Sequence, residues 1–241
     1  MTAGDLHGME VIMTINEMQN LNRATMDYVL SVIKSGMSLC EIRKLSEGFM
    51  LSHGADSFWC WDVGAFVFSG TETAISISGR EYKTSDSIIE NDDIITIDLS
   101  PQKNSVWGDY ARTIIVENGK VVTDIQKIQN EEWRFGLQME DELHEIMRSF
   151  VNTKTTFGEL FYFINDYIKD KGYINLDFLG NLGHSIVNEK SKRLYIEKGN
   201  NIKLSEVEVF TFEPHIGFPN STYGFKKENI YSFIDGHLIE I

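Results

Sequence analysis

The stretch DIITIDLSPQKNSVWGDYARTIIV (93–116) reads as two extended segments joined by a polar turn, with Asp98 on the first arm and Asp109 on the second. In a hairpin whose turn is centred on Lys103-Asn104, Asp98 and Asp109 lie directly opposite each other, with Cβ atoms about 4.5–5.5 Å apart on one face. Like charges in opposed positions destabilise a strand pair. The two carboxylates therefore require a cation, a shared proton or open water, and we expect them to hold metal.

Three further polar residues lie in or beside segments that read as apolar strands. His184 is in NLGHSIV, Glu213 ends the run VEVFTF before a proline, and Glu228 precedes NIYSFI. Taken singly, the histidine reads as a packed core residue and each glutamate as a solvated strand end. Together with the two aspartates they make four carboxylates and one imidazole, a donor set that suits Mn²⁺, Fe²⁺, Co²⁺ or Zn²⁺.

The order of these residues, D(x10)D … GH … EP … E, resembles the metal-ligand signature of the pita-bread hydrolases. That family includes methionine aminopeptidases, Xaa-Pro dipeptidases and aminopeptidase P. The aspartate of GDY is followed by Arg112-Thr113, which is characteristic of the family. The resemblance covers nearly the whole chain, from the first helix to the terminal GHLIEI.

The resemblance implies two divalent metal ions (Mn, Co, Fe or Zn). Asp98 would bind one ion and His184 the other, while Asp109 and Glu228 would bridge the two. Glu213 would be a further ligand and could also be the catalytic base. Two such ions lower the pKa of a water and polarise a carbonyl group.

The chain departs from the family pattern at the residues that contact the scissile amide. One histidine that usually follows the ligand histidine is replaced by Ser191 or Lys192, and residues 70–97 contain no histidine. Lys226 replaces the arginine that normally precedes the last glutamate by two positions. His215 is the only other histidine near a motif; it either substitutes catalytically or has a surface or packing role. The metal site is therefore predicted more firmly than peptide cleavage.

The aromatic stretch SFWCWDVGAFVFSG (57–70) is typical of a strand, on which Trp59 and Trp61 would share one face. They read either as core packing or as an apolar wall of a substrate pocket, with Lys226 as a further pocket residue. Cys60 reads as an inert thiol rather than a nucleophile, because no histidine is near it in the sequence.

The rest of the chain predicts two rounds of helices followed by strands. Capping-box patterns at Thr14, Ser38 and Thr156 each open a helix, and a long charged helix is expected from Thr123 to Val151. Later strands are expected at Leu182–Val187, Val207–Phe212 and Asn229–Ile234. The expected fold class is α+β. The resemblance implies a pita-bread fold, in which two pseudo-symmetric halves share a curved antiparallel sheet and the helices lie on its outside. No linker divides the sequence, so residues 1–241 are expected to form a single domain.

Composition limits the partners. The net charge is −14, from 22 basic and 36 acidic residues, which disfavours nucleic acid and anionic membranes. Two cysteines make no disulfide framework and suit a reducing compartment. With no signal peptide pattern and no long apolar run, the sequence predicts a soluble cytoplasmic protein; a homodimer is one assembly that it allows.

We expect a metal-dependent hydrolase that cleaves an amide bond of a short peptide or another amide-containing small molecule. The separation of 15 positions from Glu213 to Glu228 favours Xaa-Pro substrates, whereas the chain length is closer to the methionine aminopeptidases. Two alternatives stay open. One is a non-peptidase enzyme on the same metal site, a lyase or a specialised C–N hydrolase; the other is a non-catalytic binding protein.

Overall fold

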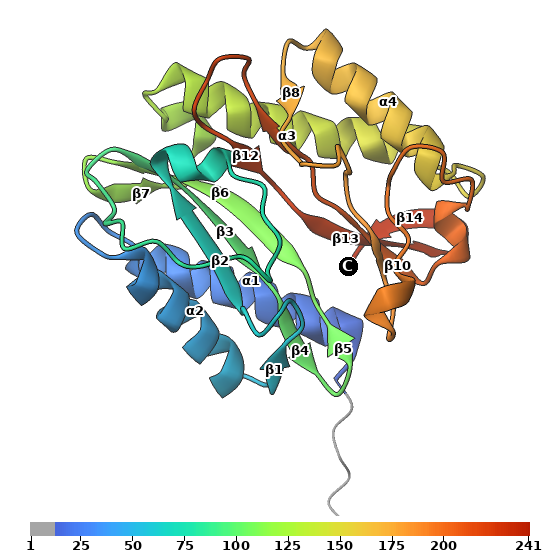
Figure 1. Cartoon of the computed structure of the whole chain (residues 1–241), viewed down its shortest axis with the longest axis horizontal. Helices are drawn as coiled ribbons and strands as arrows, with labels where there is room; N and C mark the ends of the chain where they lie inside the picture. The colour runs from blue at the N-terminus through green and yellow to red at the C-terminus, as the bar shows by residue number, and fades with distance from the viewer. Residues whose placement is uncertain (1–12) are drawn as a thin grey trace, which may run out of the picture.

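The computed structural model describes residues 13–241 and has two halves, each with a pair of helices on the outside of antiparallel strands (Figure 1). The first half contains α1 (Ile15–Val32), α2 (Leu39–Ser52), β1 (Ser57–Phe58), β2 (Ala65–Ser69), β3 (Asp93–Leu99), β4 (Pro101–Lys103), β5 (Val106–Trp107), β6 (Tyr110–Glu117) and β7 (Lys120–Val122). The second contains α3 (Glu131–Phe150), α4 (Phe157–Asp170), β8 (Ile174–Asn175), β9 (Ser185–Ile186), β10 (Val209–Phe212), β11 (His215–Gly217), β12 (Phe225–Lys226), β13 (Asn229–Ile234) and β14 (His237–Glu240).

The helices begin where their capping signals predict, with one exception. Thr14, Ser38 and Thr156 each form a complete capping box, and the helices follow at the next residue. The expected helix from residue 123 begins only at Glu131. The Glu117 carboxylate accepts hydrogen bonds from the N–H groups of Gln129 and Asn130, which holds this segment against β6 before the helix starts. The predicted start was therefore wrong by two turns.

The central strands of the first half lie in the order β2-β3-β6-β7. The predicted register of the aspartate hairpin is wrong by two residues: Asp98 pairs with Ala111, not with Asp109. The turn is centred on Asn104-Ser105, both with positive φ, instead of Lys103-Asn104. Asp109 still lies on the same face as Ala111, because alternate residues of a strand share a face. The two carboxylates are diagonal neighbours rather than direct ones.

Alternation along β3 decides which side chains face the helices. Ile95, Ile97 and Leu99 are buried in the core between the sheet and α1 and α2. The intervening residues, among them Thr96 and Asp98, therefore face the other half of the molecule. This places a carboxylate on the inner surface, where the two halves meet.

The aromatic stretch after α2 is not the continuous strand that its composition predicts. β1 and β2 are separated by a tight turn in which Cys60 bridges Val63, and Trp61 and Asp62 both have positive φ. Trp59 and Trp61 therefore do not share a strand face.

The second half has the sheet order β14-β13-β10-β9, with β12-β11-β8 beside it. The strand expected at Asn229–Ile234 is confirmed, and that at 207–212 begins two residues late. Of the strand expected at 182–187 only Ser185–Ile186 is regular.

The two halves join along β6, through a bridge between Arg112 and Lys227 and a hydrogen bond from the Glu228 N–H to the Ala111 carbonyl. Within the described part of the chain, no helix is long and apolar enough to span a membrane.

Candidate metal centre

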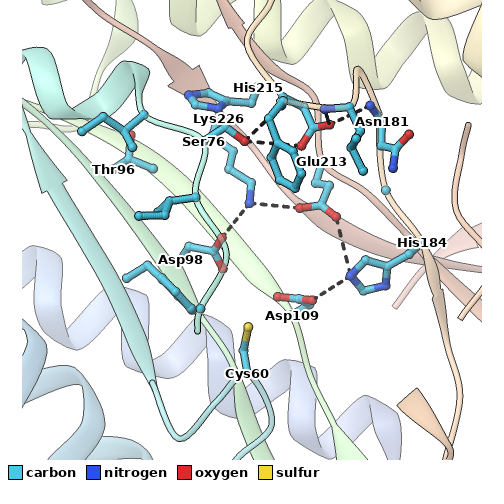
Figure 2. A pocket seen from close by; sticks show the side chains of 18 of the residues that line it. Cys60, Ser76, Thr96, Asp98, Asp109, Asn181, His184, Glu213, His215 and Lys226 are labelled. Carbon is cyan, nitrogen blue, oxygen red and sulfur yellow. Dashed lines mark hydrogen bonds and ion pairs between the residues drawn. The ribbon is translucent and has the colours of Figure 1, made fainter. Parts of the chain in front are cut away.

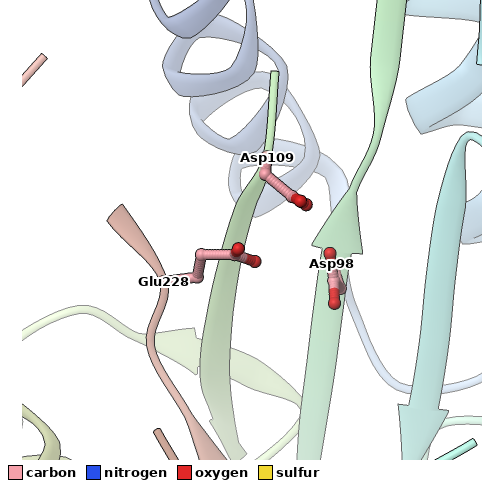
Figure 3. A group of neighbouring side chains, drawn as sticks. All are labelled: Asp98, Asp109 and Glu228. Carbon is pink, nitrogen blue, oxygen red and sulfur yellow. The ribbon is translucent and has the colours of Figure 1, made fainter. Parts of the chain in front are cut away.

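The five residues predicted as metal ligands come together where the two halves meet, although they come from five different segments. Asp98 lies near the end of β3, Asp109 just before β6 and Glu228 between β12 and β13 (Figure 3). His184 precedes β9 and Glu213 follows β10. Each therefore lies at or next to a strand end, where the backbone is held by the sheet and the side chain can point out of it.

Three of the carboxylates lie close together. One oxygen each of Asp98, Asp109 and Glu228 lie within 4.8 Å of one another. Glu228 is completely buried, and neither of its oxygens has a hydrogen-bond partner among the described residues. Burial and the neighbouring carboxylates, Asp109 foremost, raise the pKa of Glu228 well above its usual range. A buried carboxylate without a donor requires a proton or a cation, so the donor set fits a divalent metal ion.

The ring of His184 has the orientation of a metal ligand. Its Nδ1–H donates to the Ser185 carbonyl at 3.2 Å, which leaves the lone pair on Nε2. Nε2 faces Asp109 Oδ2 at 3.5 Å and Glu213 Oε1 at 3.6 Å (Figure 2). Burial lowers the pKa of His184 to about 4, so the ring is neutral near pH 7. A lone pair facing two carboxylate oxygens is repulsive, and a cation between them removes the repulsion.

The backbone beside this histidine is fixed by close packing. The His184 N–H donates to Thr211 Oγ1 at 3.0 Å, and the Thr211 N–H donates to the His184 carbonyl at 2.7 Å. Gly183 has φ +140°, and a Cβ at this position would lie 2.3 Å from the Thr211 carbonyl oxygen. Only glycine can occupy the position without moving the strand, which explains the Gly-His pair of the sequence.

Lys226 is the main cation at the centre. Its Nζ lies 2.6 Å from Asp98 Oδ2 and 3.0 Å from Glu213 Oε2 (Figure 2). It also lies 3.9 Å from Glu228 Oε2. Burial opposes a charge on Glu213, but Lys226 and His184 outweigh it and lower the pKa of Glu213. Glu213 is therefore ionised near pH 7. For Asp98 burial is the stronger effect and raises the pKa, although Lys226 opposes it.

Four residues of the centre, Asp98, Asp109, His184 and Glu213, line a cavity of about 420 Å³. Of the predicted pocket residues, Trp59 and Lys226 line this cavity. Trp59 stacks near Trp107 at 4.4 Å between ring centroids and lies edge-on to His184 at 5.8 Å. Trp61 does not line it: the side chain lies in the turn before β2 and is 59% exposed. The pocket role predicted for Trp61 is therefore not supported.

His215 lines the same cavity, but one of its ring nitrogens is already used. Its Nε2–H donates to the Thr73 carbonyl at 2.7 Å. Burial lowers the pKa of His215 to about 4, so it is a neutral imidazole near pH 7. The segment that replaces the missing family histidine lies on the surface: Ser191 and Lys192 are exposed and bond to Glu189. Burial, with a smaller contribution from Asp98, raises the pKa of the cavity-lining Cys60 thiol to about 12.

Several cavity residues were not identified from the sequence. Phe66 on β2 lies opposite Asp98 on β3, and Phe68 is two residues further on the same face of β2. Alternation along β2 puts the two phenylalanines on one face, but only the pairing of β2 with β3 shows that this is the face of Asp98. Tyr195, Ile75 and the segment at Phe178-Leu179 come from loops. No local pattern marks these loop residues, since only tertiary packing brings them over the site.

The sequence matches metallopeptidase family M24 over residues 14–233, and the chain belongs to this family. Membership places it among the metallohydrolases, in agreement with the prediction from the ligand order.

Individual relatives are distant. A methionine aminopeptidase from Helicobacter pylori is 24% identical over 202 residues, covering 76% of this chain and 70% of the relative. The solved X-Pro aminopeptidase from Thermotoga maritima superposes with a TM-score of 0.76 at 22% identity, covering 94% of this chain but 59% of that one. The methionine aminopeptidase from Rickettsia prowazekii gives a TM-score of 0.69 at 16% identity and covers 94% of both chains. The predicted pita-bread fold is confirmed.

Proposed function

We propose that the chain is a metal-dependent hydrolase that cleaves an amide bond of a short peptide or peptide-like molecule. The observation that carries the proposal is the buried Glu228 carboxylate. It has no hydrogen-bond donor among the described residues, and it lies beside two other carboxylates, one of which faces Nε2 of His184. Such an arrangement destabilises the protein unless a cation is bound. A cluster of charged residues that is unfavourable for folding without an ion is expected at a functional site, where the residues serve binding instead of stability.

Asp109, His184, Glu213 and Glu228 would hold a divalent ion, with Asp98 beside them. When bound, such an ion lowers the pKa of a coordinated water and polarises a substrate carbonyl. Glu213 is ionised near pH 7, so its carboxylate can accept the proton of the attacking water and pass it to the leaving amine. Trp59 and the other aromatic walls exclude bulk water, which strengthens these electrostatic effects.

The cavity supports a small substrate. At about 420 Å³ it is within the usual range for small-molecule sites and suits a molecule of dipeptide size. Its walls are mainly aromatic and aliphatic: Trp59, Phe66, Phe68, Ile75, Phe178 and Leu179. An Xaa-Pro peptide or a peptide with a bulky apolar first residue fits such walls. We place this activity in the cytoplasm, because Cys40 and Cys60 are unpaired.

The test is a screen of Xaa-Pro dipeptides and Met-peptides with the metal-loaded protein, followed by the Glu213→Gln variant. We expect cleavage of at least one peptide, and a loss of kcat of at least about 100-fold in the variant. Glu208→Gln is the matched control, because Glu208 is an exposed residue five positions earlier in the chain. Full activity of Glu213→Gln would remove Glu213 from the proposed role.

A second candidate, a non-peptidase enzyme on the same metal site, is favoured by one observation. Among the described cavity-lining residues the only imidazoles are His184 and His215, and the latter is bonded to the Thr73 carbonyl. Two groups that usually contact the scissile amide are therefore absent or occupied. Turnover of non-peptide amides or betaines by a sample that cleaves no peptide would establish this alternative.

A further inference from the structure

The side chain of Lys226 extends from the second half of the molecule to the first. Its backbone is in β12, where it pairs with His215, and its ammonium group reaches Asp98 on β3 at 2.6 Å. The same ammonium lies 3.0 Å from Glu213 and 3.9 Å from Glu228. It is thus surrounded by three carboxylates that were all predicted as metal ligands.

The position of this ammonium is fixed from both ends. The Lys226 N–H donates to Thr113 Oγ1 at 2.8 Å, and the same hydroxyl donates back to the Lys226 carbonyl at 3.2 Å. The side chain is only 17% exposed. A lysine that is held at its backbone and buried along its stem cannot turn its charge to solvent without breaking these contacts.

The ammonium closely contacts two of the carboxylate oxygens and not the others, of which Glu213 Oε1 accepts a hydrogen bond from the Thr211 hydroxyl at 3.3 Å. It forms ion pairs with Asp98 Oδ2 and Glu213 Oε2. On the opposite side, Glu213 Oε1 and Asp109 Oδ2 face the lone pair of His184 Nε2, and neither Glu228 oxygen has a hydrogen-bond donor among the described residues. The cluster therefore has a cation on the Asp98 side and lacks one on the His184 side.

We propose that the Lys226 ammonium takes the place of one of the two metal ions, so that the centre binds a single divalent ion on the side of His184. The ligands of that ion are Asp109, His184, Glu213 and Glu228. Four carboxylates can neutralise two divalent ions, but with one lysine inside the cluster a second ion brings a net positive charge into a buried site. The inference concerns the metal site on which the proposed function rests, but it makes no assumption about the substrate.

The first experiment counts metal. Chelated protein is titrated with Mn²⁺ and, separately, with Zn²⁺ by calorimetry, and bound metal is measured after gel filtration. We expect one ion per chain for the wild type and two for Lys226→Met, which keeps the length of the stem and removes the charge. Lys227→Met is the matched control, since the neighbouring lysine pairs with Asp141 instead of the cluster; it should bind one ion. Two ions of similar affinity in the wild type would overturn the inference.

The second experiment does not depend on the folding of the lysine variant. Asp98→Asn should still bind one ion with an affinity within about threefold of the wild type, because Asp98 is occupied by Lys226. His184→Ala should lose at least about 100-fold in affinity. A loss of affinity in Asp98→Asn as large as that in His184→Ala would contradict the assignment. Since the readout is bound metal, one ion per chain without any peptide cleavage would support this inference while removing the proposed function.

Discussion

The Glu228→Gln substitution should change stability and metal affinity in opposite directions. Without metal, Glu228 is a buried carboxylate that lies near three others and has no hydrogen-bond donor in the part of the chain that the structure describes. A glutamine has almost the same shape, carries no charge, and its NH₂ group can donate to a neighbouring carboxylate. We therefore expect the metal-free variant to be more stable than the metal-free wild type and to bind metal less tightly.

The magnitude follows from the burial. An unsatisfied buried polar group costs about 1–3 kcal/mol, and more when it is charged. For a chain of this size 1 kcal/mol corresponds to about 2–4 °C in Tm, so the metal-free Tm should rise by roughly 2–12 °C at pH 7.5. Metal affinity should fall by at least about 100-fold, because one ligand carboxylate is lost.

The effect depends on pH in a defined direction. Burial raises the pKa of Glu228 in the folded chain, so its protonated form is well tolerated below the unfolded pKa of about 4.3. Stability is then lost as the pH rises towards the folded value, because the folded chain resists releasing the proton. The difference between variant and wild type should therefore be small near pH 4.5 and larger at pH 7.5.

The assay is thermal unfolding in EDTA and in Mn²⁺ at both pH values, with Glu140→Gln as the control. Glu140 on α3 is also buried, and burial raises its pKa well above the usual range, but it is not one of the clustered ligands. Its variant should gain stability in EDTA and keep metal affinity. A metal-free Glu228→Gln that is less stable than the wild type at pH 7.5 would refute the reasoning.

Two further predictions concern Gly183 and Cys60. Gly183→Ala should lower the free energy of unfolding by at least about 2 kcal/mol and weaken metal binding, because the new Cβ would lie 2.3 Å from the Thr211 carbonyl oxygen and displace His184. Denaturant unfolding with and without metal measures both effects. An unchanged unfolding midpoint would count against the packing argument. Cys60 should resist iodoacetamide at pH 8 in the folded chain and react after unfolding, since raising its pKa from 9.0 to about 12 lowers the thiolate fraction roughly a thousandfold. Mass spectrometry of the peptide that contains Cys60 measures the extent of labelling. Rapid labelling of the folded chain would show that the thiol is more acidic than its burial implies.

Local sequence signals predicted the elements that depend on nearby residues. The capping boxes at Thr14, Ser38 and Thr156 use side chains three residues apart, so the first residues of those helices could be predicted. The start of α3 could not, because Glu117, more than ten residues earlier, holds the segment before it. The C-terminal end of α1 also involves a distant segment: the helix ends at Val32, and Lys34 then pairs with Lys120.

The register of the aspartate hairpin shows the same limit. Both Lys103-Asn104 and Asn104-Ser105 are acceptable turn centres from composition alone. Pairing with distant segments decides between them: Gln102 pairs with Ser57, and the Ser100 N–H donates to the Gly64 carbonyl. The hypothesis of a metal site survives the shift of two residues, because such a shift keeps both aspartates on one face.

The sequence by itself determined the chemical character of this protein: four carboxylates, one imidazole and their order. These depend on residue type, which a sequence states directly. Only the tertiary structure decided that Trp59 lines the cavity while Trp61 is exposed, and that Lys226 lies within the carboxylate cluster. Asp98 and Lys226 are 128 residues apart, and the packing of the two halves against each other brings a lysine ammonium to a position where the ligand pattern alone predicted a metal ion.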